Sequence, residues 1–89
     1  MAVLNTEILA SGATALPSST VSVDQGAVNT LILRSTDEDA GLEIEIQTSD
    51  GWVRFGSLSA KNPVEQVRGP GNYRLWRNAG NSAAADKAV

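Results

Sequence analysis

Two residue types that carry much of the chemistry of protein sites are missing from this chain of 89 residues, which has neither cysteine nor histidine. Without cysteine the chain forms no disulfide and no thiolate metal site. Without histidine it lacks the commonest general base and the commonest zinc ligand, and no serine has the partner base that a nucleophile needs. We therefore expect no enzyme, no metal and no cofactor.

Positive charge and long apolar runs are also scarce. The chain has 7 Lys and Arg against 10 Asp and Glu, a formal charge of −3, whereas a surface that binds nucleic acid needs clustered cations. No apolar run approaches the roughly 20 residues that cross a bilayer, and residues 1–7 lack the basic start of a secretory signal. We expect a soluble protein made in a cytoplasm, with neither nucleic acid nor membrane as a partner.

The length predicts a single small domain with a thin margin of stability. A chain of this size buries only about 60 to 65% of the surface that its unfolded form exposes. Small folds therefore often depend on disulfides, metals or partner subunits. Since the composition removes the first two, we expect stabilisation by oligomerisation.

Alternation of apolar and polar residues predicts a series of short strands. The clearest are residues 21–23, 28–34, 42–48, 52–58, 64–68 and 72–77. Within 42–48 the alternation directs Leu42, Ile44 and Ile46 to a core and Glu43, Glu45 and Gln47 to water. No helical stretch is long enough for a parallel crossover. The predicted fold is all-β, a small antiparallel β-sandwich or barrel of about six to seven short strands with extended N- and C-terminal segments.

Two turns have specific signals. Asp50-Gly51 predicts a type I′ hairpin turn between residues 42–48 and 52–58. Gly69-Pro70-Gly71 predicts a type II turn, in which Pro70 supplies a fixed φ and Gly71 a positive φ.

The termini are weakly patterned, so we divide the chain into a β-domain at residues 19–78, an N-terminal arm or edge strand at 1–18 and a C-terminal tail at 79–89. Residues 6–11 fit an edge strand of the domain. They equally fit part of an arm that orders only against a neighbouring molecule through Val3, Leu4, Ile8 and Leu9. Residues 83–88 could form a helical turn, too short to be stable alone, in a tail that is frayed or partner-dependent.

Two acidic groups are candidates for chemistry. Asp37-Glu38-Asp39 lacks the ligand spacing of a calcium loop, so we expect a solvated loop there and no metal site. Glu43 and Glu45 would lie about 7 Å apart on one strand face, a spacing near that of paired carboxylates in glycoside hydrolases. Alternating glutamates on the wet face of a strand are ordinary, and we expect a role in solubility.

The last strand places its aromatic residues on two faces. The alternation puts Tyr73, Leu75 and Arg77 on one face and Arg74 with Trp76 on the other. We expect Tyr73 and Leu75 to belong to the core. Trp and Arg are enriched at interface hot spots, so Arg74 and Trp76 are candidates for binding a partner.

A set of short motifs resembles small β-proteins encoded in the genomes of tailed bacteriophages. The motifs are Asp50-Gly51-Trp52-Val53, Leu58, Asn62-Pro63, Val67 and Gly69-Pro70-Gly71-Asn72-Tyr73-Arg74, within roughly residues 20 to 78. The resemblance implies a virion structural protein, such as a capsid decoration or cement protein that binds the outer shell and stabilises the head. It also implies the major capsid protein or another virion protein as partner, a homo-oligomer with a trimer favoured, and an N-terminal arm on the capsid.

Two other functions fit the same residues. The chain could be a binding module of the tail or fibre that recognises a host glycan or protein through Trp52 and Trp76. It could also be a small regulatory β-domain with an unknown partner.

Overall fold

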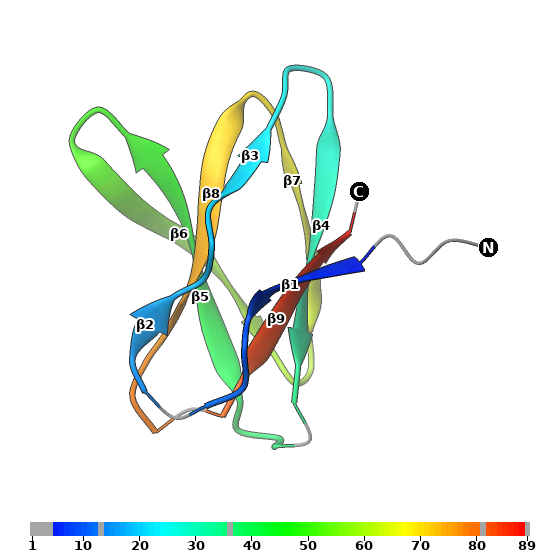
Figure 1. Cartoon of the computed structure of the whole chain (residues 1–89), viewed down its shortest axis with the longest axis vertical. Helices are drawn as coiled ribbons and strands as arrows, with labels where there is room; N and C mark the ends of the chain where they lie inside the picture. Colours follow the sequence, from blue (N-terminus) through cyan, green and yellow to red (C-terminus); the bar gives the residue numbers. More distant parts are fainter. Residues whose placement is uncertain (1–4, 13, 36, 81, 89) are drawn as a thin grey trace.

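The computed structural model describes residues 5–12, 14–35, 37–80 and 82–88. The protein is all-β, and its described residues form nine strands in two antiparallel sheets that pack as a small β-sandwich (Figure 1). The first sheet has the order β1 (Asn5–Leu9), β9 (Ala84–Ala88), β4 (Val28–Arg34) and β7 (Val64–Arg68). The second has the order β2 (Leu16–Pro17), β8 (Gly71–Arg77), β5 (Gly41–Thr48) and β6 (Gly51–Ser59), and β3 (Val21–Val23) also pairs with β8. The predicted all-β fold is confirmed.

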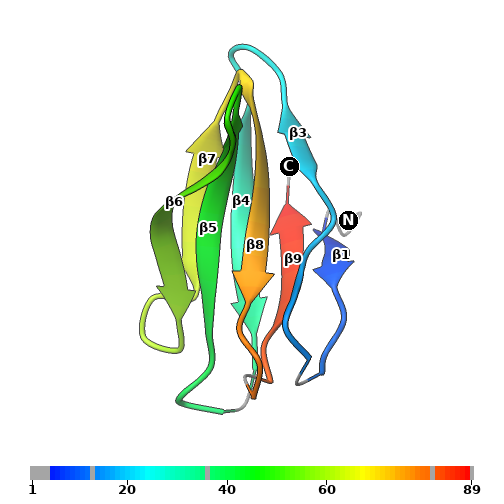
Figure 2. The same cartoon turned by 90° about the vertical axis from the view of Figure 1, so that its left-hand side faces the viewer.

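The core lies between the two sheets, which Figure 2 shows one behind the other. The largest fully buried side chains are Val21, Leu31, Leu42, Ile44, Leu58 and Leu75. They come from strands of both sheets, because the period of two in each strand turns alternate side chains inward. The predicted core residues Tyr73 and Leu75 are both buried there.

The C-terminal segment is a strand, and the predictions of a helical turn or a frayed tail are wrong. β9 lies between β1 and β4 and pairs with both of them. Its alanines favour a helix as isolated residues, but pairing with two neighbouring strands overrides that weak preference. Residues 5–9 form an edge strand of this sheet, the first of the two alternatives for the N-terminal segment. The first and last described strands therefore belong to the same folded unit.

Both turns differ in conformation from their predictions. The β5–β6 hairpin forms as expected, with Thr48 paired to Gly51. In this hairpin φ is positive at Gly51, and no described residue other than a glycine has a positive φ. A type I′ turn needs positive φ at both of its central residues, so the predicted type I′ turn is wrong. The Gly69–Pro70 peptide bond is cis, and Gly71 is not among the glycines with positive φ. The type II turn is therefore also wrong.

Gly69 marks a close approach of two backbones. Its N–H donates to the carbonyl of Ala27 at 3.0 Å. A Cβ built at Gly69 would overlap the carbonyl of Asp24. Glycine is needed here because the β7–β8 turn lies directly against the β3–β4 turn.

Two side chains on the inner face of β8 donate hydrogen bonds to backbone carbonyls at the ends of other strands and in loops. The hydroxyl of Tyr73 donates to the carbonyl of Arg68 at 2.6 Å, at the end of β7. Arg77 is only 2% exposed. Its guanidinium donates to the carbonyls of Thr14 at 2.9 Å, Ala10 at 2.7 Å and Ala83 at 2.9 Å. Arg77 thus joins the β1–β2 and β8–β9 connections.

Candidate functional site

The outer face of the second sheet carries the strongest cluster of aromatic and charged side chains. We call it the Trp–Arg face, and it consists of Glu43, Glu45, Trp52, Arg54, Arg74 and Trp76. Strand pairing brings these residues together, since Glu43 lies opposite Trp76 and Glu45 lies opposite both Arg74 and Arg54. The period-two alternation of β5, β6 and β8 directs all of them to the same side of the sheet.

Arg74 is the centre of this face. Its Nε donates to Oε1 of Glu45 at 2.7 Å, and its guanidinium carbon lies 4.3 Å from the centroid of the Trp52 ring. A cation over the face of a tryptophan is attracted by the ring quadrupole. The three side chains therefore hold one another in a defined arrangement.

A second arginine, Arg54, pairs with both glutamates of this face. Arg54 Nε lies 3.6 Å from Oε2 of Glu43, and its Nη2 lies 3.8 Å from Oε2 of Glu45. Glu45 is mostly buried and lies between two arginines. Both glutamates of this face are thus paired with arginines.

Trp76 lies at the other end of the face, opposite Pro17 of β2 and Glu43 of β5. It is half-buried, and its indole N–H donates to Oδ1 of Asn78 at 3.1 Å. This hydrogen bond orients the ring while part of its surface stays accessible. Rigid, partly exposed tryptophans of this kind suit protein interfaces.

The predicted partner residues have different outcomes. Arg74 and Trp76 lie on the outer face of β8, as the alternation predicted, and Trp52 lies on the same sheet face. Ile8 and Leu9 are only 7% and 4% exposed and belong to the core, because their strand packs onto the sandwich. This placement corrects the expectation of an apolar arm at these two positions, since the chain's own domain covers them. Val3 and Leu4 lie outside the described residues.

The acidic loop has a structural arrangement of its own. The N–H of Asp37 donates to Oγ of Ser35 at 3.0 Å, and the N–H of Asp39 donates to Oδ1 of Asp37 at 2.9 Å. These bonds form a local turn. In the described part of the chain, no three or more acidic side chains are grouped as a metal site would need. Nor do the described residues include a helix long and apolar enough to cross a membrane.

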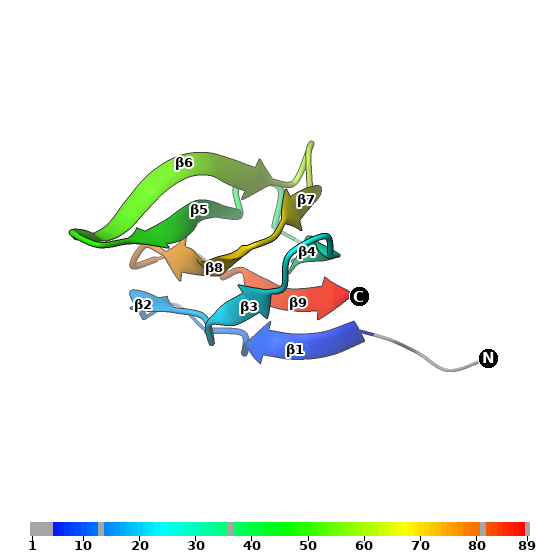
Figure 3. The same cartoon turned by 90° about the horizontal axis from the view of Figure 1, so that it is seen from above.

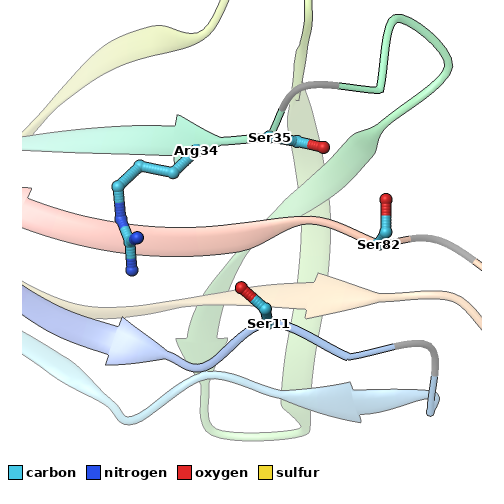
Figure 4. A pocket seen from close by; sticks show the side chains of 4 residues that line it. All are labelled: Ser11, Arg34, Ser35 and Ser82. Atoms are coloured by element: carbon cyan, nitrogen blue, oxygen red, sulfur yellow. The ribbon is translucent and has the colours of Figure 1, made fainter.

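A surface pocket of about 430 Å³ lies at one end of the sandwich, lined by Ser11, Arg34, Ser35 and Ser82 (Figure 4). Arg34 is paired with Glu7 at 2.5 Å and with Asp86 at 3.0 Å. The hydrogen bond to Glu7, and after it the one to Asp86, raises the pKa of the Arg34 guanidinium above its ordinary value. Two carboxylates already neutralise this arginine, so the pocket offers little attraction to an anion.

Comparison of the chain with protein-family models, curated proteins and solved structures found no match. The alternation of its strand predicted that Glu45 faces water and serves solubility, and the exposure to water is wrong, since Glu45 is only 8% exposed and is paired with Arg74 and Arg54. The sequence signal for these ion pairs is a Glu-x-Glu pattern in one strand, together with Trp-x-Arg and Arg-x-Trp patterns in the two strands that pair with it.

Proposed function

We propose that this protein is a non-enzymatic virion structural protein of a tailed bacteriophage, a capsid decoration protein that binds the outer shell through the Trp–Arg face. The observation that carries the binding role is the open sheet face on which Arg74 stacks on Trp52 and binds Glu45. The resemblance of several short motifs to small phage β-proteins supports the virion assignment. The partner is then the major capsid protein or another virion protein, met after synthesis in the host cytoplasm.

The geometry of the face suits a protein partner. Tryptophan and arginine are the residues most enriched among interface hot spots. Because Arg74 is already held by Trp52 and Glu45, binding would cost little side-chain entropy at the centre of the face. Trp76 is then the accessible aromatic anchor.

The alternative is a host-recognition module of the tail or fibre that uses the same face. A sugar would have to stack on an open aromatic ring. Arg74 already occupies one side of the Trp52 ring, which favours a protein over a glycan as the ligand. We therefore place capsid binding first.

The test uses heads of the phage that encodes the chain, assembled without it. Purified protein is added back, and bound protein is measured after sedimentation of the heads. We expect Trp76→Ala to weaken binding by about 2 kcal/mol, or roughly 30-fold, as a hot spot would. Val64→Ala, on the first sheet, should bind like the parent protein.

Two results would reject capsid decoration. One is that the parent protein does not sediment with the heads. The other is that Trp76→Ala binds the heads normally but no longer binds the host cell surface, which would support the alternative. Circular dichroism of each variant shows whether it is folded.

A further inference from the structure

The edges of the two sheets are protected unequally against pairing with another chain. β2 and β3 have only two and three residues, and β2 contains Pro17. β1 has a register irregularity between Glu7 and Leu9. β7 places charged Glu65 on the same strand face as buried Val67. Short strands, proline, bulges and inward-facing charges are the usual protection of an edge.

β6 has little of this protection. It is nine residues long, contains neither proline nor lysine, and among the described strands pairs only with β5 (Figure 3). On its inner face Val53 and Phe55 are 49% and 53% exposed. The inner face of a sheet in a sandwich is normally buried against the other sheet. The irregularity in its pairing with β5 falls at Phe55, so the segment from Gly51 to Arg54 is a regular and accessible edge.

We propose that β6 pairs antiparallel with β6 of a second copy of this chain, around a two-fold axis at Val53. In that register Trp52 of each copy lies opposite Arg54 of the other copy. Two cation–π pairs therefore form on the outer face. On the inner face Val53 meets its own equivalent, an apolar pair at the axis. Each cross-strand pair is complementary in charge or shape, which favours a second copy over an unrelated strand.

The symmetry has a direct consequence. A two-fold axis of this kind is perpendicular to the joined sheet, and a self-complementary contact closes at two copies. The pair is therefore a dimer and not the trimer that the phage resemblance implies. Both Trp–Arg faces then point to the same side, and a dimer can bind two sites on one surface with increased avidity. The dimer itself does not depend on the proposed function.

The first test is the mass of the protein in solution, measured by sedimentation equilibrium over a range of concentrations. We expect a reversible dimer of the 9.3 kDa chain. Val53→Lys places two like charges at the axis and should raise the dissociation constant about tenfold or more. Val64→Lys is the matched control, because Val64 is 52% exposed on the edge strand β7, and it should leave the dimer unchanged.

The second test uses the absence of cysteine from the chain. Residues directly opposite in antiparallel strands have Cα atoms about 4.5 to 5.5 Å apart, within the range of a disulfide. Val53→Cys should therefore form a covalent dimer on mild oxidation, whereas Val64→Cys should stay largely monomeric. A monomer at every concentration, a trimer, or a dimer that persists in Val53→Lys would overturn the proposal. Failure to bind phage heads by an intact dimer would reject only the proposed function.

Discussion

Arg74 and Trp52 come from strands that are not adjacent in the second sheet, yet the Arg74 guanidinium carbon lies 4.3 Å from the centroid of the Trp52 ring. The contact spans β5, whose Glu45 binds the same arginine. One side chain on β8 thus connects three strands across the outer face. This arrangement predicts that two arginines of the same face contribute very differently to stability.

Arg74→Ala should lower the free energy of unfolding by about 1 to 3 kcal/mol, because it removes a charge-assisted hydrogen bond and a cation–π contact and leaves Glu45 short of a partner. Arg54→Ala is the control. The Arg54 side chain is 49% exposed and its contacts are looser, so its loss should cost about 0.5 kcal/mol or less. Urea unfolding measures both values. Equal effects would show that Arg74 has no special structural role.

Arg77 predicts a larger loss. Arg77→Met keeps the apolar stem but removes the donors to Thr14, Ala10 and Ala83. Leaving these carbonyls without a donor should cost about 3 to 5 kcal/mol. Hydrogen exchange should also show faster opening of the β1–β2 and β8–β9 connections. Arg68→Met, at an exposed arginine, should change stability by about 0.5 kcal/mol or less. A stable Arg77→Met variant with unchanged exchange would contradict the role of Arg77.

Gly69 provides a test of backbone packing. Gly69→Ala forces the β7–β8 turn away from Asp24, and we expect a loss of about 2 kcal/mol or more. At Gly56 a Cβ would meet Ile44 Cδ1 at 3.5 Å, an ordinary contact, so Gly56→Ala should be tolerated. Thermal unfolding of both variants measures the difference. If the two variants melted at the same temperature, the close approach at Gly69 would not restrict the residue at this position.

Much of the sheet architecture could be predicted because alternation is a local property. The strand at 42–48 shows in its own residues which side chains face the core, and so does the strand at 72–77. The outward direction of Arg74 and Trp76 was therefore accessible without knowledge of the fold. The strand at 84–88 was not, because its alanines have no alternation, and only its two neighbours in the sheet make it a strand.

The sequence by itself determined the all-β class, most of the strands and the faces of their side chains, since these follow from residue type and a period of two. Only the tertiary structure decided which of these faces meet. It buried Ile8 and Leu9 by placing β1 beside β9, joined Arg77 to the β1–β2 connection more than 60 positions away, and brought Glu45 to Arg74 across 29 positions. Such contacts depend on strand order, which arises from the closure of the whole sandwich and is not encoded in any single segment.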